Sequence, residues 1–276
     1  MPVAVVADSA AALGPELAQR YGIVTVPMQL EIGGEAVSEQ EVPLEELVAR
    51  LDDGVKTSGP PPGAFADAIQ RADQGDGVVV LTVASRFSST YQSAAMAAGM
   101  AADPTRVRVI DTGTAAGAEG LVVIAAAEAA AAGADVAGVA RRAEEVAGKV
   151  RLVAAVEQLT YLVRGGRVPA GAARVGTHLG VRVLFELRGA KLHPMRPSLS
   201  AEGATEQILG AWRRSKVPGA ALHVAALHAL RPAEAGALLE AVRAEVEPAT
   251  AFVGTFGPVM VAHTGPGVIG LAWWWD

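Results

Sequence analysis

The sequence predicts an α/β protein with a mostly parallel N-terminal sheet flanked by helices and a C-terminal α/β part with a mixed or antiparallel sheet. The first observation is that short β-branched runs alternate with Ala-rich stretches in the first half of the chain, as they do in βαβ units. The second is that this rhythm changes after about residue 151, where the strand candidates become shorter and more separated. The third is the length of 276 residues, which is enough for two hydrophobic cores.

The first half of the chain predicts a regular series of strands and helices. The strand candidates are the apolar runs at residues 3–6, 24–30, 78–83 and 107–110. The helix candidates have helix-forming composition and are residues 44–51, 64–72, 90–101, 117–132 and 136–150. Gly133 separates the last two helices, because glycine commonly ends a helix.

The second half predicts another set of elements and a division of the chain. The strand candidates are residues 152–156, 182–187, 191–195, 222–227 and 251–253. The helix candidates are residues 158–163, 204–215 and 232–246. We therefore predict an N-terminal α/β domain of residues 1–152, a C-terminal α/β domain of residues 153–276 and a cleft between them. The tryptophans at the end of the chain, Trp273 to Trp275, are expected to serve terminal packing or an interface edge.

The composition argues against several classes of function. The net charge is −6 and the basic residues are scattered, so there is no electrostatic footprint for nucleic acid. The chain has no cysteine and its histidines lack paired spacing, which argues against disulfides, cysteine nucleophiles and zinc. No basic segment precedes the first apolar run, and acidic residues interrupt the apolar region 115–140. We therefore expect no signal peptide, no membrane span and a soluble, cytoplasmic protein.

A hydroxyl-rich loop follows the strand candidate at residues 78–83. Ser88, Ser89 and Thr90 stand in succession where the next helix begins. One of these hydroxyls would suffice to cap the helix. A loop between a parallel strand and a helix N-terminus also offers free amides to an anion, and the run of hydroxyls favours this second interpretation.

Two further segments carry polar groups that suit the same site. Thr57 and Ser58 precede prolines that stiffen the chain, which suits a Pro-rich turn and also suits preorganised donors for a carboxylate. His263 follows the apolar run 258–262 and precedes a Gly-Pro-Gly turn, so we expect it at the end of a strand. A lone histidine is more often structural, but the hydroxyl clusters favour a binding role.

Arginines flank a pair of glycines after the helix candidate at 158–163. Arg164 fits a helix C-terminus closed by glycine. Arg167, beyond the glycines, fits either the same structural role or the recognition of a phosphate or an acidic partner by its planar fork of donors. The residues alone leave both interpretations open.

Two other functions compete with a binding role. Ser88, Asp111 and His263 occur in the order of an α/β-hydrolase triad, which would make the protein a serine hydrolase or esterase, although the Gly-x-Ser-x-Gly elbow is missing. A phosphate- or nucleotide-binding enzyme would also use hydroxyl-rich loops, although the chain has neither a Walker A motif nor a Gly-x-Gly-x-x-Gly fingerprint.

Taken together, the motifs resemble those of the DegV family of bacterial fatty-acid-binding proteins. The motifs that carry the resemblance run along the whole chain and are Asp8-Ser9, Tyr21-Gly22-Ile23, Thr57-Ser58 with Pro60, Ser88 with Thr90 to Ala94, Asp111-Thr112, Tyr161-Leu162 with Gly165-Gly166-Arg167, Arg196, and His263 to Gly267. The chain departs from the family pattern at Gly59, where Gln is usual, at Ser89, which replaces Gly, at Arg182-Val183, where Lys-Pro is typical, and at Pro197, which replaces Thr.

The resemblance implies a carrier without catalytic activity or cofactor that buries one long-chain fatty acid between two domains. It implies that Thr57, Ser58, Ser88, Ser89 and His263 surround the carboxyl group. Members of the FakB type present that group to a separate ATP-dependent fatty acid kinase, related to dihydroxyacetone kinases, which forms an acyl phosphate. Arg167 and Arg196 are then the candidates for contact with the kinase or the phosphorylated product, and transient membrane contact is compatible with this role.

Overall fold

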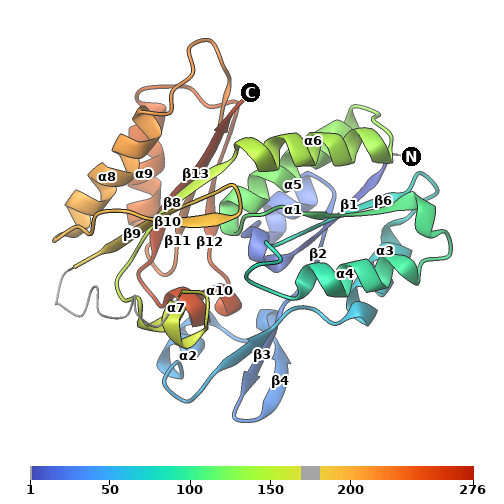
Figure 1. The fold of residues 1–276 in the computed structure, drawn as a ribbon, viewed down its shortest axis with the longest axis horizontal. Helices are drawn as coiled ribbons and strands as arrows, with labels where there is room; N and C mark the ends of the chain where they lie inside the picture. The colour runs from blue at the N-terminus through green and yellow to red at the C-terminus, as the bar shows by residue number, and fades with distance from the viewer. Residues whose placement is uncertain (1, 169–180) are drawn as a thin grey trace.

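The first sheet consists of four parallel strands in the order β2-β1-β6-β7 (Figure 1). The structure is a computed structural model that describes residues 2–168 and 181–276. The four strands, in chain order, are β1 (Ala4–Asp8), β2 (Ile23–Val26), β6 (Val78–Thr82) and β7 (Val107–Asp111). Every residue of β6 is buried, as expected of a β-branched strand in a parallel sheet covered on both faces.

Helices cover both faces of this sheet. On one face lie α3 (Pro62–Ala72) and α4 (Thr90–Gly99), and on the other lie α5 (Ala116–Ala131) and α6 (Val136–Lys149). The short helix α1 (Pro15–Arg20) connects β1 to β2, after the 3-10 turn η1 (Ser9–Ala11), and another 3-10 turn, η3 (Pro104–Arg106), precedes β7. The predicted βαβ rhythm is therefore confirmed.

The second sheet has six strands in the order β10-β9-β8-β13-β11-β12 and is mixed. Only β11 and β12 run parallel among these neighbours, and the other pairs are antiparallel. In chain order the strands are β8 (Arg151–Val156), β9 (Val183–Arg188), β10 (Lys191–Pro194), β11 (Leu222–His228), β12 (Thr250–Thr255) and β13 (Ile269–Trp275). The helices α8 (Ala201–Arg213) and α9 (Pro232–Arg243) pack on one face.

The helix α5 lies between the two sheets and contacts both (Figure 1). Almost all of its residues are buried, which explains why its composition is Ala-rich and apolar around the whole circumference. Close packing depends on two glycines. A Cβ at Gly117 would come within 2.5 Å of Leu227 on β11, and a Cβ at Gly120 within 2.5 Å of the Ala11 carbonyl oxygen after β1. One continuous hydrophobic core therefore joins the sheets through α5.

A small antiparallel sheet and three short helices lie together at the lower edge of the molecule in Figure 1. The sheet has the order β4-β3-β5 and consists of β3 (Gln29–Ile32), β4 (Glu35–Ser38) and β5 (Lys56–Ser58). The helices are α2 (Leu44–Ala49), α7 (Thr160–Arg164) and α10 (Pro258–Thr264), and the 3-10 turn η2 (Glu39–Glu41) precedes α2. Both α2 and α7 pack against α10.

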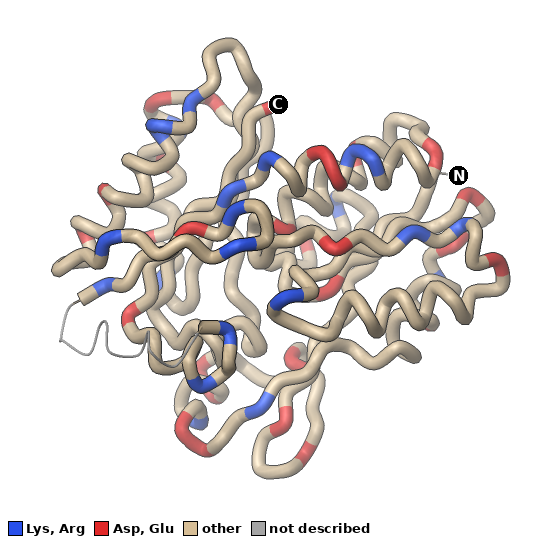
Figure 2. The backbone as a smooth tube through the Cα atoms, in the orientation of Figure 1, with Lys and Arg blue, Asp and Glu red and all other residues tan. Residues whose placement is uncertain are grey.

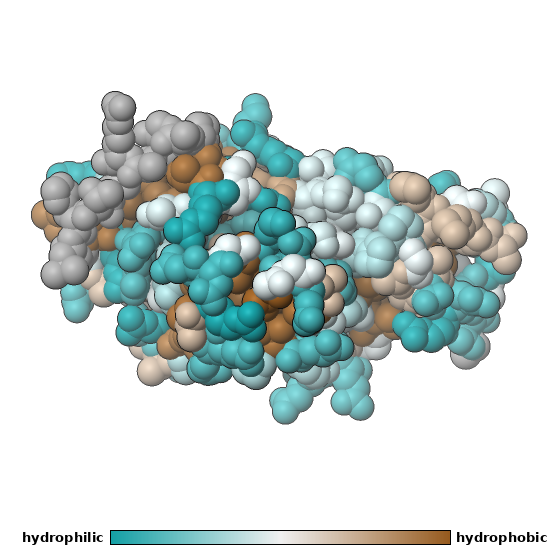
Figure 3. All heavy atoms as spheres, turned by 90° about the horizontal axis from the view of Figure 1, so that it is seen from below, coloured by the Kyte–Doolittle hydropathy of each residue, from teal (hydrophilic) through white to brown (hydrophobic). Residues whose placement is uncertain are grey.

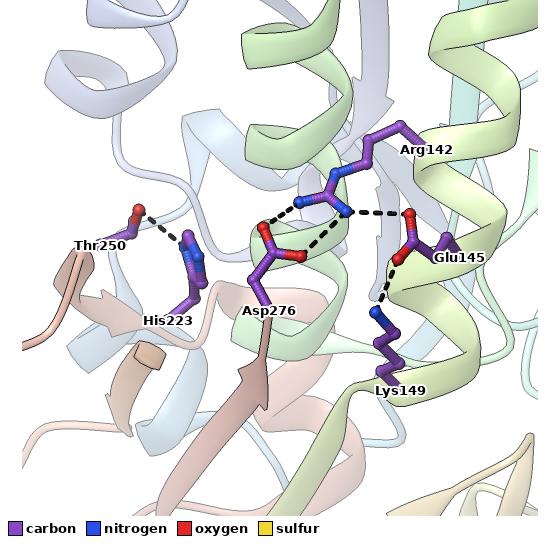
Figure 4. A network of polar contacts seen from close by, with 6 residues as sticks. All are labelled: Arg142, Glu145, Lys149, His223, Thr250 and Asp276. Atoms are coloured by element: carbon purple, nitrogen blue, oxygen red, sulfur yellow. Dashed lines mark hydrogen bonds and ion pairs between the residues drawn. The ribbon is translucent and has the colours of Figure 1, made fainter. Parts of the chain in front are cut away.

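Charged residues of both signs are scattered along the chain, as Figure 2 shows. One network joins the two halves of the sequence (Figure 4). Arg142 on α6 donates two hydrogen bonds to the Asp276 carboxylate, at 2.5 and 3.2 Å, and a third to Glu145 at 2.9 Å. Arg142 also lies 4.9 Å from the ring of Trp274, and the His223 ring stacks on Trp274 at 4.2 Å.

Several sequence predictions need correction. Residues 24–30 do not form one strand, because the chain breaks at Pro27 into β2 and β3. The run 258–262 is helical and belongs to α10, so His263 lies in a helix. Thr57 and Ser58 lie in β5 instead of a Pro-rich turn. The terminal tryptophans belong to β13, an interior strand between β8 and β11, so of the two expectations for them the packing role holds and the interface edge does not.

Candidate functional site

A cavity opens where the first sheet, the second sheet and the small antiparallel sheet meet. Its empty space, which includes open solvent at the mouth, is about 1070 Å³. The lining comes from residues 28–116 and from residues 152–268. Figure 3 shows the face of the molecule on the side of α2, α7 and α10, where hydrophobic atoms are visible between hydrophilic ones. The cavity is therefore built by both halves of the chain.

The predicted polar residues line this one cavity. Thr57, Ser58, Ser88, Ser89 and His263 all contribute to its wall, and so does Arg167. They come from four separate parts of the fold: β5, the loop between β6 and α4, the turn after α7, and α10. The structure thus brings together residues that lie more than 200 positions apart in the sequence.

The Ser88 loop leaves β6 at its carboxyl end and enters α4 at Thr90. Ser88 Oγ lies 2.7 Å from Thr90 Oγ1 and accepts a hydrogen bond from the Thr90 amide at 3.3 Å. Ser89 is the residue before the helix, but its side chain makes no capping bond. Ser88 is half-buried and Ser89 is exposed, so the cap is supplied by Ser88 and the Ser89 hydroxyl is free of that task.

Gly59 allows β5 to approach this loop closely. A Cβ at this position would lie 2.5 Å from Thr90 Oγ1 and 3.3 Å from Ser88 Oγ. Since real Cβ atoms do not come so close to other atoms, a larger residue requires the Ser88 loop to move. The departure from the family pattern at Gly59 therefore has a steric consequence in this chain.

His263 and Thr57 close the same end of the cavity from the other side. Thr57 pairs with Leu30 across β3 and β5, and its Oγ1 lies 2.8 Å from His263 Nε2. His263 lies in the last turn of α10. The other ring nitrogen, Nδ1, is buried and has no hydrogen-bond partner among the described residues. A Cβ at Gly165 would lie 2.4 Å from that nitrogen, so the ring packs directly against the α7 terminus.

Burial controls the charge of His263. The low-polarity surroundings lower the pKa of the imidazole to about 4, and the positive charge of Arg167 acts in the same direction. His263 is therefore neutral at physiological pH. A neutral imidazole has one donor and one acceptor nitrogen. The Thr57 hydroxyl and His263 therefore make this end of the cavity polar, and the ring itself carries no positive charge.

Arg167 supplies the positive charge at this end. Its side chain donates to the carbonyl oxygens of Phe87, at 3.1 Å, and of Gly165. Both acceptors are main-chain groups, and burial lowers the pKa of the guanidinium. The Phe87 contact also fastens the segment after α7 to the Ser88 loop. Arg167 therefore both shapes the mouth and leaves a positive field there.

The rest of the cavity is apolar. One face of the second sheet provides its floor, through the facing pairs Leu152 with Leu187 and Ala154 with Phe185. Leu192 on β10 extends this floor. Apolar residues from α5, α10 and neighbouring loops complete the wall. One polar end and a long apolar interior suit an amphipathic ligand.

Arg196 lies outside this cavity. It is exposed in a separate surface groove formed by the segment after β10 and by α8, together with Leu199, Gln207 and Arg214. The structure therefore separates the two arginines that the sequence had grouped.

The groups of a hydrolase triad are not joined by hydrogen bonds. Asp111 Oδ1 accepts from the amides of Ser85, at 3.1 Å, and Gly113, at 2.9 Å. His263 contacts Thr57 through Nε2, and its Nδ1 has no partner within the described residues. Nothing in the arrangement supports the serine hydrolase interpretation.

Sequence reasoning missed the apolar lining and the residues beneath it. Met28, Val83, Phe185 and Val259 line the cavity, but apolar side chains carry no signal that distinguishes a ligand wall from an ordinary core.

No helix in residues 2–168 and 181–276 is long and apolar enough to cross a membrane. The same residues contain no cluster of three or more His, Asp or Glu side chains suited to a metal ion.

Comparison with known proteins agrees with this architecture. The sequence profile of the family described as "Uncharacterised protein, DegV family" matches residues 2–275. A DegV domain-containing protein of Streptomyces coelicolor is 36% identical, over 98% of this chain and 97% of that protein. A protein of Thermotoga maritima named fatty acid-binding protein is 27% identical, over 98% and 96% of the two chains.

Solved structures give the same result. A DegV family protein from Thermus thermophilus, described for its fatty acid binding, matches with a TM-score of 0.89 at 28% identity, over 100% of both chains. DegV from Bacillus subtilis, described as a fatty acid binding protein, matches with a TM-score of 0.86 at 26% identity, also over 100% of both chains. The resemblance read from the motifs is confirmed, and the chain belongs to the DegV family.

Proposed function

We propose that this protein binds one long-chain fatty acid, with the acyl chain in the apolar cavity and the carboxyl group at its polar end. The observation that carries the proposal is the joining of Thr57, Ser58, Ser88, Ser89 and His263 at one end of a cavity with an apolar floor. The relatives named for fatty acid binding support it. The ligand would lie between residues 1–152 and 153–276, the two domains that we infer from the sequence.

The acyl chain supplies the binding energy in this proposal. Burying a methylene group contributes about 0.8 kcal/mol, so a chain of some fifteen contributes roughly 12 kcal/mol before the cost of ordering the ligand. The polar end then needs only to orient the carboxyl group. The hydroxyls of Thr57 and Ser88 and the neutral ring of His263 offer hydrogen bonds to it, and Arg167 favours its negative charge.

We infer further that the protein presents the carboxyl group to a separate fatty acid kinase and performs no catalysis itself. The hydroxyls leave a carboxylate oxygen free of a tight counter-ion, so that it remains able to attack a phosphoryl donor. Ser58 and Ser89 are exposed at this end, which gives a partner access. Arg167 at the mouth and Arg196 in the outer groove are the proposed contacts with the kinase or with the acyl phosphate. This role places the protein in the cytoplasm, where ATP is available.

Mass spectrometry of the organic extract from denatured, freshly purified protein tests the binding role. We expect one class of fatty acid near an equimolar ratio to protein. The Thr57→Ala, Ser88→Ala double variant should retain less fatty acid while its circular dichroism spectrum stays the same. A wild-type protein that carries no lipid and takes up none would contradict the proposal, as would equal retention by the double variant.

The kinase role needs a separate measurement. With a purified fatty acid kinase and ATP, the wild-type protein should support formation of acyl phosphate. The Arg167→Ala variant should keep most of its bound fatty acid, because the acyl chain supplies most of the binding energy, but it should form less acyl phosphate. Equal phosphorylation of both proteins would remove Arg167 from this role.

A further inference from the structure

A buried carboxylate lies beneath the polar end of the cavity and does not line it. Glu39, in η2, is only 5% exposed. Its Oε1 accepts a hydrogen bond from the Ser9 hydroxyl, and its Oε2 accepts one from the Val259 amide at 3.1 Å. Ser9 Oγ in turn accepts from the Met28 amide at 2.9 Å. These hydrogen bonds connect η2 to η1 at the end of β1, to the segment between β2 and β3, and to α10.

These bonds hold one end of α10. Val259 is in the first turn of α10, and His263 is in the last. The helix is therefore fixed near its beginning by Glu39 and near its end by the 2.8 Å contact between His263 and Thr57. The close fit extends to Gly257, where a Cβ would lie 3.0 Å from Glu39 Oε2.

The same chain of contacts reaches the opposite wall of the cavity. Ser9 follows Asp8, whose Oδ2 accepts from the Val83 amide at 2.8 Å. Val83 lines the cavity at the start of the segment that leads to Ser88. Polar contacts through Asp8, Ser9 and Glu39 thus connect the strand end that carries the Ser88 loop to the helix that carries His263.

We infer that Glu39 is a positioning residue for the polar end of the cavity, acting on the ligand through α10 and His263. The inference rests on the proposed fatty acid binding. A carboxylate suits these contacts, because Ser9 donates to one oxygen and the Val259 amide donates to the other. A glutamine at this position keeps one oxygen for the Val259 amide, but its NH₂ group is unable to accept from Ser9, so the Ser9 hydroxyl has to reverse its role and find another acceptor. An aspartate is one methylene too short to reach both.

The Glu39→Gln variant tests this role, and the first readout is the dissociation rate of a fluorescent fatty acid. We expect dissociation to accelerate by up to roughly tenfold, the limit set by the loss of one buried hydrogen bond to a charged group. The Ser9→Ala background provides a double-mutant cycle, because it removes one of the two opposing donors. The effect of Glu39→Gln should therefore be smaller in that background.

The second readout separates positioning from a general loss of stability. The ring signals of His263 in NMR spectra, assigned with a His263→Gln variant, should shift in the Glu39→Gln protein. Glu41→Gln, an exposed neighbour, should leave both the signals and the rate unchanged. Leu238→Ala, in the separate core under α9, should lower the unfolding free energy without accelerating dissociation when rates are compared well below the unfolding transition.

Three results decide the matter. Unshifted His263 signals in the Glu39→Gln protein overturn the inference, and so does an acceleration no greater than that of Leu238→Ala at equal stability. If the wild-type protein binds no fatty acid, the proposed function fails. In that case the His263 signals of the ligand-free wild-type and Glu39→Gln proteins are compared. A shift supports the positioning of His263 by Glu39, and unshifted signals refute it.

Discussion

At the scale of single residues, two carboxyl groups share a fully buried position where β1 meets α5. Asp8 accepts hydrogen bonds from the amides of Ala10, at 2.9 Å, and Val83, at 2.8 Å. Burial raises the pKa of Glu119 well above its usual value, and the neighbouring Asp8 charge raises it further. Glu119 is therefore protonated at neutral pH, and neither of its buried carboxyl oxygens has a hydrogen-bond partner among the described residues.

This protonation makes stability depend on pH. Above about pH 4.5, the usual pKa of Glu, the unfolded chain releases the Glu119 proton while the folded protein keeps it. The contribution of Glu119 to the unfolding free energy therefore falls as pH rises, by up to about 1.4 kcal/mol per pH unit. Glutamine does not titrate, so Glu119→Gln should gain stability relative to the wild type between pH 5 and pH 8.

Urea unfolding at several pH values measures this difference. Glu144→Gln is the control, because Glu144 is exposed on α6 and its replacement should change stability little at any of these pH values. A stability difference between wild type and Glu119→Gln that stays constant from pH 5 to pH 8 would show that Glu119 does not keep its proton in the folded protein.

Gly59 provides a second test at this scale. In the Gly59→Ala variant the new methyl group would lie 2.5 Å from Thr90 Oγ1, so the Ser88 loop has to move. We expect a loss of about 1 to 3 kcal/mol in stability and weaker retention of fatty acid. Gly63→Ala is the matched control, because a Cβ there meets no atom within 4 Å. Equal retention by the two variants would mean that the loop adapts without cost to binding.

At the scale of elements, the sequence predicted the long helices and buried strands well and the short elements poorly. Residues 117–132 and 136–150, predicted to be helical from their helix-forming composition, match α5 and α6 within a residue at each end. The run 258–262 is apolar and partly β-branched, so it does not distinguish a strand from a short helix. Pro258 at the first helical position and Gly257 before it are the start signals that decide for the helix.

For the candidate site too, the sequence predicted the type of side chain better than its place in the fold. Serine, threonine and histidine side chains were predictable because their chemistry is visible in the sequence, and they line one cavity. Arg196 looked similar to Arg167 but lies in another groove, since only the path of β10 decides where it points. Glu39 gave no signal, because its partners Ser9 and Val259 are 30 and 220 positions away.

The packing of α5 gives a prediction for a whole element. In Gly120→Ala the added methyl group would lie 2.5 Å from the Ala11 carbonyl oxygen, a main-chain atom with little freedom to move. We expect a loss of about 1 to 3 kcal/mol or more, since α5 has to shift against both sheets. Thermal unfolding measures the loss. Gly148→Ala on α6, where a Cβ meets nothing within 4 Å, should not destabilise, and equal midpoints for the two variants would contradict the close packing.

At the scale of the whole molecule, helices and sheets alternate in layers, with α5 and α6 shared by both sheets (Figure 1). The core that includes β1 also includes residues of β8, β9, β11 and β13. The Arg142 network adds a polar connection between α6 and Asp276 (Figure 4). The two inferred domains therefore share apolar contacts that a pair of loosely linked domains would not have.

A shared core predicts a single unfolding transition. The four tryptophans report on α8 and β13, and hydrogen exchange of the β6 peptide reports on the first sheet. Both probes should give the same denaturant midpoint, because neither sheet keeps its packing without α5. Added fatty acid should raise both midpoints together. Two separate midpoints would show that the sheets unfold independently.

The place of β13 bears on how the protein forms during synthesis. β13 follows every other strand of the second sheet in the chain, yet it lies between β8 and β11. Until the ribosome has released it, the nascent chain holds two partial sheets whose facing edges are unpaired, and open edges invite pairing with other chains. Among the strands of the second sheet, the last to emerge is thus the one that joins the two parts, and the edges of β8 and β11 stay open to other chains until that moment.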